Sequence, residues 1–215
     1  MDTVFLIVDD HPMIIEGYCT ILKKYYPTAL FYKASTIEEA LTISNKLSHI
    51  DFLLIDYQIG SSKESFEKIH NGVDLANWFR KEHPNSKILM ITAHEEALII
   101  YSIHKKSFPD GLLIKRDVNA VVLETALSEI KTGALYYSEK AKEAMKSMAQ
   151  KKFLQQEHNV QILLLLDQGY KIKELSSKLF VSESMLNKRI ASLKQIFEVS
   201  DNGGLLREAK NQGFI

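Results

Sequence analysis

The sequence predicts an α/β protein with a doubly wound parallel sheet, followed by a smaller all-α part. In roughly the first 130 residues, five short apolar runs alternate with amphipathic helical patterns, which is typical of a sheet covered by helices on both faces. Past Thr132-Gly133 the apolar strand patterns stop and only helical patterns follow. The chain of 215 residues has room for one large domain or two smaller ones, and 46% hydrophobic residues suffice for real cores.

Each predicted strand is an apolar run that is too short for a helix. The five runs lie at 4–8, 30–34, 52–56, 87–91 and 111–114. The helical patterns that follow them lie at 13–25, 36–47, 73–81, 95–105 and 119–130. Parallel strands joined through helices are connected by right-handed crossovers. The expected fold is therefore a flavodoxin-like, five-stranded parallel sheet.

Polar residues stand at the ends of four of these runs. Asp56 ends the third run, Asp9 and Asp10 follow the first, Thr92 follows the fourth and Lys115 follows the fifth. The carboxyl ends of parallel strands face the ligand crevice, so we expect these side chains to converge. Three carboxylates repel one another unless a cation neutralises them, and oxygen ligands suit Mg²⁺. A hydroxyl and an ammonium suit the oxygens of a phosphoryl group carried by a carboxylate.

Each of these residues also has an ordinary structural explanation. A single Asp after a strand is often a turn former or the cap of the following helix. Asp9 and Asp10 can cap the helix that begins near Pro12, and this role is compatible with metal binding. Lys115 taken alone is typical of a surface lysine.

The five residues together, in this order and on these strands, resemble the receiver domain of two-component response regulators. The stretch Leu6-Ile7-Val8-Asp9-Asp10-His11-Pro12, with Glu16-Gly17 after it, is further similar to the NarL/FixJ group, whose members carry a LuxR-type DNA-binding domain. The resemblance covers roughly the first 130 residues and implies a receiver domain at 1–132.

The resemblance implies a role for each site residue. Asp56 is the phosphoacceptor for a sensor histidine kinase, Thr92 is the switch hydroxyl and Lys115 contacts the phosphoryl group. In this family, the residues two positions after the phosphoacceptor and after the switch hydroxyl influence how fast the acyl phosphate hydrolyses. Here they are Gln58, which could orient a water, and His94, which could cover the phosphoryl group. The implied Mg²⁺ ligands are three carboxylates and one backbone carbonyl: Asp9, Asp10, Asp56 and Gln58.

The chain departs from the family pattern after the phosphoacceptor. Gly60 stands where receivers commonly have proline, and a motif resembling the family's next one, at 71–75, arrives about eight residues late. Residues 61–68 are therefore interpreted as an insertion, either a solvated loop or a lid or kinase-specificity element. His70 is expected at the surface. Leu112 replaces the family's aromatic switch residue, so we expect the signal to pass through Thr92 and the 95–106 segment.

Residues 133–152 are expected to form a helical linker, with Ser138 as an N-cap. Residues 153–215 carry helical patterns at 160–168, 172–179, 183–197 and 205–212. A helix, a tight turn with a Ser cap and a longer helix is typical of a helix-turn-helix domain. The run from Lys173 to Ser184 and the closing Gly213-Phe214-Ile215 resemble the LuxR-type domain.

The predicted recognition helix diverges from that family. Met185-Leu186-Asn187-Lys188-Arg189 stands where the family has Thr-Val-Lys-x-His, and 156–159 diverges from its opening Thr-x-Arg-Glu. Asn187 and Lys188 are expected to read bases, because an amide suits adenine and an ammonium suits guanine. Phosphate contacts are expected from four further polar residues. They are Ser182, Ser184, Arg189 and Lys194. The alternative is a helical partner-binding module that has lost DNA binding.

Charge and cysteine content bound the remaining possibilities. The formal net charge is zero, but residues 150–215 hold ten Lys or Arg against seven Asp or Glu, which mildly favours nucleic acid as a partner of this part. The single cysteine, Cys19, excludes a disulfide within a monomer. The apolar runs at 4–8 and 162–166 are too short for a signal peptide or a bilayer span. A cytoplasmic protein without a membrane partner is expected.

The expected function is that of a phosphorylation-dependent transcription regulator that dimerises when phosphorylated. A phosphorelay or protein-interaction regulator whose helix-turn-helix no longer binds DNA is the main alternative, and a constitutive pseudo-receiver is another. We do not expect an enzyme. A haloacid-dehalogenase-type phosphatase needs a second Asp two residues after the nucleophile, where this chain has Gln58 after Asp56 and His11 after Asp9.

Overall fold

The computed structural model describes residues 2–59, 69–150 and 158–215. The predicted insertion at 61–68 lies outside these residues, and so do Gln156 and Glu157. The chain divides into two compact units. The first comprises Met1–His94 and Ile103–Lys142, and the second comprises Glu95–Ser102 and Glu143–Ile215.

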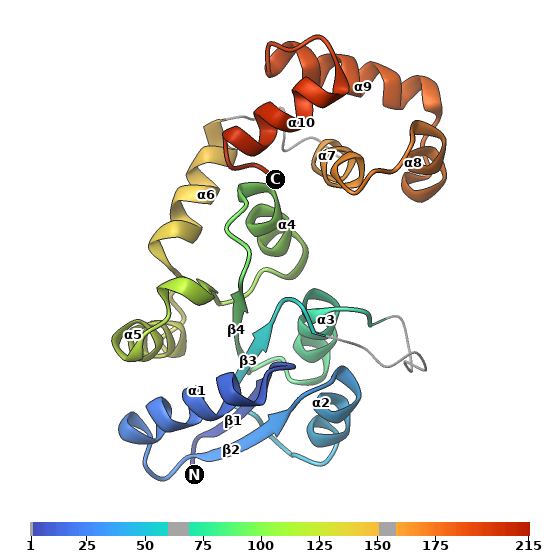
Figure 1. Ribbon diagram of the computed structural model, residues 1–215. Coiled ribbons are helices and arrows are strands. Elements are labelled where there is room, and N and C mark those ends of the chain that lie inside the picture. Colours follow the sequence, from blue (N-terminus) through green and yellow to red (C-terminus); the bar gives the residue numbers. More distant parts are fainter. Residues whose placement is uncertain (1, 60–68, 151–157) are drawn as a thin grey trace. The chain divides into compact units, whose positions relative to one another are not determined.

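A parallel sheet forms the centre of the first unit (Figure 1). Its strands are β1 (Val4–Val8), β2 (Leu30–Ala34), β3 (Phe52–Asp56), β4 (Lys87–Thr92), β5 (Gly111–Ile114) and β6 (Tyr136–Tyr137). Their order across the sheet is β2-β1-β3-β4-β5-β6, and each neighbouring pair is parallel. The five predicted strands are confirmed. The prediction of a five-stranded sheet was wrong, because the two-residue strand β6 pairs with β5 inside the segment that was predicted to be a helical linker.

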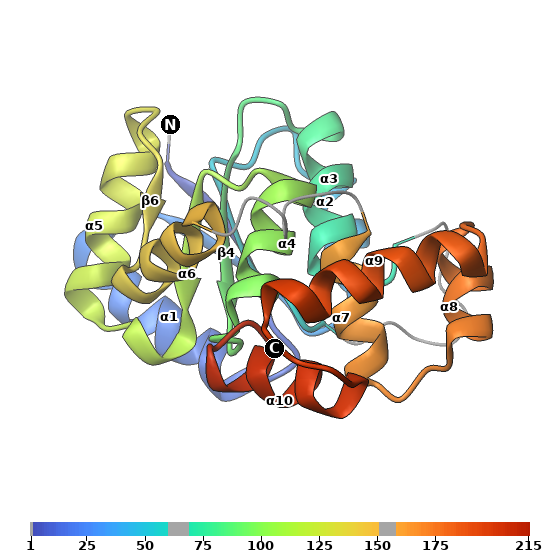
Figure 2. The same ribbon diagram turned by 90° about the horizontal axis from the view of Figure 1, so that it is seen from above.

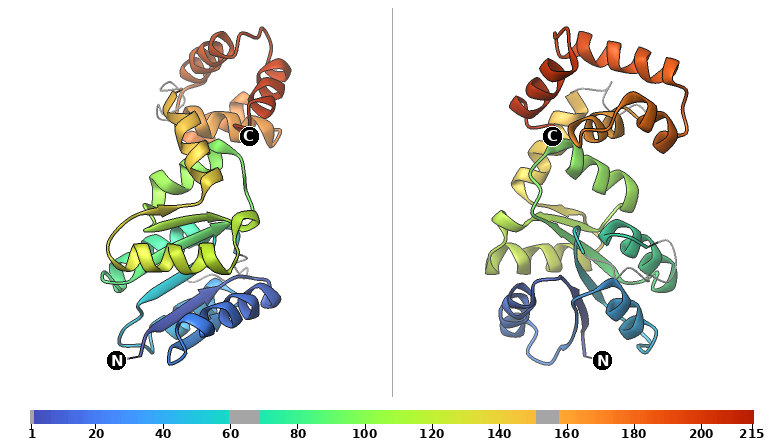
Figure 3. Two further views of the ribbon diagram at one scale, coloured as in Figure 1. Left: turned by 90° about the vertical axis from the view of Figure 1, so that its left-hand side faces the viewer. Right: turned by 45° about the vertical axis from the view of Figure 1, so that its right-hand side comes forward.

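Helices cover both faces of the sheet, as the alternating pattern predicted. The helices are α1 (Pro12–Tyr25), α2 (Ile37–Ser44), α3 (Gly72–Glu82), α4 (Ala97–Ser107) and α5 (Ala120–Lys131). Figure 3 shows α1 and α5 on one face of the sheet and α2 and α3 on the other. The core beneath α1 and α5 joins Leu22 and Leu127 to Phe5 and Phe52 of the sheet. All strand positions from Val4 to Val8 and from Phe52 to Asp56 are buried, which explains why these runs are apolar without alternation.

The second unit is helical, and Figure 2 shows its helices from above. They are α7 (Asn159–Asp167), α8 (Ile172–Leu179), α9 (Glu183–Ile196) and α10 (Asn202–Asn211), and most of α6 (Glu139–Gln150) also belongs to this unit. Residues 97–102 of α4 belong here as well. The N–H groups of Ala97 and Leu98 donate to the carbonyls of Gly213 and Phe214, at 2.8 and 3.0 Å. The helices at 172–179 and 183–197 are thus confirmed to within one residue.

Within residues 2–59, 69–150 and 158–215, no helix is both long enough and apolar enough to cross a membrane.

Candidate functional site

The predicted site gathers around Asp56, the last residue of β3. Its side chain is 5% exposed, and one carboxylate oxygen, Oδ2, lies 2.8 Å from the ammonium nitrogen of Lys115. The same nitrogen lies 2.8 Å from Oδ2 of Asp9, whose side chain is 2% exposed. Lys115 directly follows β5 and begins a short 3-10 helix. The carboxyl ends of β1, β3 and β5 therefore meet at one buried ion-pair network, as the sequence predicted.

Burial dominates the protonation chemistry of this network. It raises the pKa of Asp56 above its ordinary value, the hydrogen bond and charge of Lys115 oppose this rise, and the charge of Asp9 adds to it. The backbone N–H of Gln58 also donates to Asp56 and opposes the rise. Burial lowers the pKa of Lys115, but its hydrogen bonds to Asp56 and Asp9 outweigh burial and the net shift is upward. Lys115 therefore stays charged and favours an ionised Asp56.

Asp10 and His11 extend the acidic end of β1. The imidazole Nδ1 of His11 lies 2.6 Å from Oδ1 of Asp10 and 3.1 Å from Oδ1 of Asp9. The N-cap position of α1 is His11, whose side chain makes no cap hydrogen bond, and Pro12 opens the helix. The acids therefore do not take the N-cap position. The backbone N–H of His11 does donate to Oδ1 of Asp9, at 2.9 Å.

The donor set fits a divalent cation. One ligand atom from each of Asp9, Asp10 and His11 can lie within 4.8 Å of the others. Lys115 pairs with Asp9 and Asp56, and Asp10 adds a third carboxylate beside Asp9. Three carboxylates and one ammonium leave two negative charges, so a divalent cation would balance them, and hard oxygen donors suit Mg²⁺.

Thr92 ends β4 and is completely buried. It pairs across the sheet with Ile114, the residue before Lys115, so the hydroxyl and the ammonium come from neighbouring strand ends. The Thr92 Oγ1 accepts a hydrogen bond from the backbone N–H of His94 at 3.1 Å. The His94 ring lies edge-on to Tyr57, with ring centroids 5.5 Å apart. The Thr92 hydroxyl is therefore connected by one hydrogen bond to the segment that leads into α4.

Gly72 is a site residue whose role the sequence argument did not identify. Its backbone N–H donates to the Tyr57 carbonyl at 3.0 Å. A Cβ atom added at Gly72 would lie 2.1 Å from the backbone oxygen of Asp56, which is far inside van der Waals contact. Asn71 before it caps α3, because its Oδ1 accepts from the N–H groups of Val73 and Asp74. The Asn-Gly pair that marks the late motif thus sets α3 directly against the end of β3.

The residues predicted to contact DNA lie at the start of α9, with one exception. Ser182 caps α9 through its hydroxyl, which accepts from the Met185 N–H at 3.2 Å. The side chains of Ser182, Ser184, Asn187 and Lys188 are exposed, and Lys194 is half-buried. Arg189 is half-buried and donates through Nη1 to Oδ1 of the fully buried Asn159, at 3.1 Å. Arg189 therefore links α9 to α7, a contact that the sequence analysis did not foresee.

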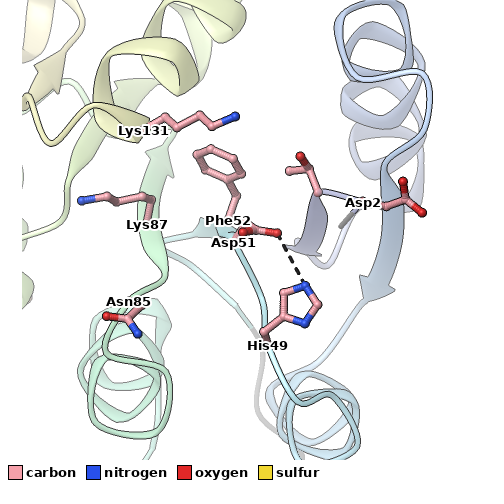
Figure 4. A pocket seen from close by; sticks show the side chains of 8 residues that line it. Asp2, His49, Asp51, Phe52, Asn85, Lys87 and Lys131 are labelled. Atoms are coloured by element: carbon pink, nitrogen blue, oxygen red, sulfur yellow. Dashed lines mark ion pairs between the residues drawn. The ribbon is translucent and has the colours of Figure 1, made fainter.

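A cavity of about 350 Å³ lies at the amino ends of the parallel strands, opposite to the Asp56 site (Figure 4). Asp51, Phe52 and Lys87 line it at the amino ends of β3 and β4, together with His49 and Lys131. The backbone N–H of Val4 donates to Oδ2 of Asp51 at 2.7 Å, and His49 lies 4.0 Å from the same oxygen. Because the cavity is at the amino ends of the strands, it is separate from the Asp56 site.

A parallel α/β fold with buried acids, a hydroxyl and a lysine at its strand ends defines a receiver domain. Residues 5–116 match the family model described as the response regulator receiver domain, and the chain belongs to this family. The VraR response regulator protein of Staphylococcus saprophyticus is 22% identical over 199 residues, which cover 91% of this chain and 90% of VraR. The nitrate/nitrite response regulator protein NarP of Escherichia coli is 24% identical, covering 87% of this chain and 85% of NarP.

Solved structures agree with this fold over both units. RcsB from Salmonella enterica serovar Typhimurium, bound to the promoter rprA with the phosphomimetic BeF₃⁻, aligns with a TM-score of 0.67 at 17% identity, covering 97% of this chain and 98% of RcsB. The protein is thus a two-component response regulator of the NarL/FixJ group, in which a receiver precedes a LuxR-type helix-turn-helix domain.

Proposed function

We propose that this response regulator accepts a phosphoryl group on Asp56 from a sensor histidine kinase and, when phosphorylated, regulates transcription by binding DNA as a dimer. The observation that carries this proposal is the Lys115 ammonium, which lies between the buried carboxylates of Asp56 and Asp9. A buried carboxylate whose ionised form is favoured by a neighbouring lysine is a competent oxygen nucleophile.

The transfer is a displacement at phosphorus. A carboxylate oxygen of Asp56 forms the new P–O bond while the P–N bond to the kinase histidine breaks, and the imidazole leaves with its bonding electron pair and takes up a proton. Lys115 neutralises charge on the phosphoryl oxygens, and the Thr92 hydroxyl donates to one of them. We propose that Asp9, Asp10, Asp56 and the backbone carbonyl of Gln58 hold Mg²⁺, which when bound supplies further positive charge.

The proposed output is a contact of α9 with the major groove. Asn187 and Lys188 are exposed near the start of the helix, where a recognition helix meets base edges. We assign phosphate contacts to Ser182, Ser184 and Lys194, and to those donors of Arg189 that do not bind Asn159. RcsB has been solved as two dimers bound to two parallel DNAs, and two recognition helices on adjacent half-sites gain affinity that one cannot. We propose a cytoplasmic location as well, because the proposed partner is DNA.

The test is enrichment of a binding site from a randomised duplex pool, with and without beryllofluoride and Mg²⁺, at two salt concentrations. We expect a two-fold symmetric site whose enrichment strengthens with beryllofluoride and weakens steeply with salt. Asp56→Asn should abolish the beryllofluoride effect and leave the fold intact. The matched control is Asp51→Asn, which changes an aspartate directly before the same strand. The side-chain oxygen of the new asparagine can still accept from the Val4 N–H.

A phosphorelay or protein-interaction regulator is the second candidate, and the divergent 185–189 segment favours it. No enrichment under any condition, with beryllofluoride still bound at Asp56, would select this candidate over the DNA-binding one.

A further inference from the structure

The linker strand β6 attaches the end of the receiver to the edge of its sheet. The backbone N–H of Tyr136 donates to the Asp110 carbonyl at 3.1 Å, and that of Ser138 donates to the Leu112 carbonyl at 3.0 Å. The Ser138 hydroxyl oxygen also accepts from the N–H of Ile114, at 3.4 Å. Because α6 begins one residue after Ser138, this short strand is the last part of the chain that is fixed to the sheet before α6 begins.

The two tyrosines of β6 point to opposite faces of the sheet, as successive strand residues do. Tyr136 packs against the core beneath α1 and α5. Tyr137 contacts α4 on the other face. Its phenol oxygen lies 2.5 Å from Nδ1 of His104, and the two rings are edge-on, with centroids 5.6 Å apart. His104 also lies edge-on to Phe108 at 5.2 Å. One side-chain hydrogen bond thus joins the linker strand to α4.

The surroundings of Tyr137 and His104 favour the uncharged forms of both side chains. Burial lowers the pKa of His104, and the charge of Lys105 adds to this effect. Burial raises the pKa of Tyr137 to about 12, with a further contribution from Asp110. A neutral imidazole and a neutral phenol can share a proton in either tautomer, so the bond does not depend on an ion pair.

The other end of α4 is connected to the phosphorylation site. The Thr92 hydroxyl oxygen accepts from the N–H of His94, and α4 begins three residues after His94. If the Thr92 hydroxyl rotated to donate to a phosphoryl group on Asp56, its oxygen would move away from the His94 N–H, and the segment that leads into α4 would shift. Such a shift of α4 would reach His104, seven residues after the first residue of the helix.

We propose that Tyr137 and His104 form a latch between α4 and the linker strand β6, closed when Asp56 is unmodified and opened by a phosphoryl group. The inference rests on the proposed function, because it assumes that the phosphoryl group is carried by Asp56. Opening the latch weakens the pairing of β6 with β5 and so loosens the connection between the receiver and its helical output domain. Tyr137 and His104 act here as positioning residues, since neither touches the phosphoryl group.

The test measures hydrogen exchange of the Tyr136 and Ser138 backbone amides in the full-length protein. NMR monitors the exchange with and without Mg²⁺ and beryllofluoride. In the wild type, both amides should exchange slowly without beryllofluoride and about fivefold faster with it, the change expected for one lost hydrogen bond. Tyr137→Phe should show the fast rate without beryllofluoride. The matched control is Tyr136→Phe, which removes a hydroxyl from the neighbouring residue and should exchange like the wild type.

A second pair of variants tests the helix side of the latch. His104→Leu removes the hydrogen-bonding group and should exchange as fast as Tyr137→Phe. His104→Asn keeps a polar group near the position of Nδ1 and should restore slow exchange at least in part.

Two results would overturn the latch. One is an unchanged exchange rate in Tyr137→Phe and His104→Leu. The other is slow exchange in the wild type while fluorine NMR shows beryllofluoride bound at Asp56, a result that leaves the proposed function standing. If beryllofluoride does not bind at all, the fluorine spectrum shows this before any amide is measured, and the proposed function fails together with the latch.

Discussion

The ammonium nitrogen of Lys115 lies 2.8 Å from Oδ2 of Asp56, in a site where both side chains are largely withdrawn from water. Lys115 directly follows β5, and β4 lies between β5 and β3 in the sheet. The long lysine side chain therefore spans the end of β4 to reach Asp56. The pair is shared with Asp9, so one positive charge serves two buried acids. This arrangement makes Lys115 a structural residue, and it places the ammonium where we propose that it contacts a phosphoryl group on Asp56.

Lys115→Ala should destabilise the receiver by about 3 kcal/mol, because it leaves two buried carboxylates without their shared cation. The matched control is Lys87→Ala, since Lys87 lies 3.5 Å from Asp110 in a more exposed pair and should cost under about 1 kcal/mol. Urea unfolding measures both. Equal losses in the free energy of unfolding of the two variants would contradict the larger contribution expected from the Lys115 pairs.

The same variant should change how stability depends on pH. Without Lys115, nothing from this lysine opposes the rise in the pKa of Asp56 that burial causes. The folded state then binds a proton more readily than the unfolded state, so stability should rise as pH falls through the raised pKa. Unfolding of Lys115→Ala at a series of acidic pH values measures this, and part of the lost stability should return.

Gly72→Ala should damage the site although Gly72 carries no functional group. The added methyl would meet the Asp56 carbonyl oxygen at 2.1 Å, so either α3 or the end of β3 must shift, at a cost of about 1–3 kcal/mol. Beryllofluoride affinity should fall as well. Gly17→Ala is the matched control, because nothing lies within 4 Å of its Cβ position in α1, and it should stabilise by about 0.5–1 kcal/mol. Unfolding curves of the two variants should therefore shift in opposite directions.

The strand-end site could be predicted from the sequence because its information is local. Asp9, Asp56, Thr92 and Lys115 each end or follow a buried apolar run, and parallel strands bring such ends together without any further detail. The requirement for glycine at position 72 could not be predicted, because it depends on how closely α3 approaches the Asp56 carbonyl. Spacing along a single chain does not contain that distance.

Two other contacts depend on partners that are distant in the sequence. Strand β6 has only two residues, too few for any periodicity, and it exists because Gly111 and Leu112 offer an edge for pairing. Arg189 bonds to Asn159, 30 residues earlier. The helical period of α9 indicates which face is apolar, but it does not indicate which polar side chain is already engaged within the domain.

Gln58→Ala and His94→Ala should change the lifetime of the phosphoryl group on Asp56. The backbone N–H of Gln58 donates to the Asp56 carboxylate, and the Gln58 side chain is exposed. This side chain can therefore orient an attacking water. Its removal should slow hydrolysis. His94 is held beside the site through Thr92 and Tyr57, and removing its ring should uncover the phosphoryl group and speed hydrolysis. Decay of labelled protein measures both, and unchanged lifetimes would contradict these roles.

Asn187→Ala and Lys194→Ala should weaken DNA binding in different ways. Loss of a base contact by Asn187 should cost about 1–3 kcal/mol on the selected site and leave binding to unrelated duplexes unchanged. Loss of a phosphate contact by Lys194 should weaken binding to both duplexes and reduce the salt slope by about 1. Titrations at several salt concentrations separate the two effects. The same salt slope and the same specificity in both variants would contradict the assigned roles.

Tyr137 should make stability fall at alkaline pH. Burial, with a contribution from Asp110, raises the pKa of its phenol to about 12 in the folded protein, whereas an unfolded tyrosine ionises near pH 10. Between these values the unfolded state binds fewer protons than the folded state, so stability must fall as pH rises through this window. Tyr137→Phe lacks this proton, and its stability should fall less over the same window in urea unfolding. Phenolate absorbance should also lose one late-titrating tyrosine, and an unchanged titration would show that the Tyr137 phenol is not held neutral in the folded protein.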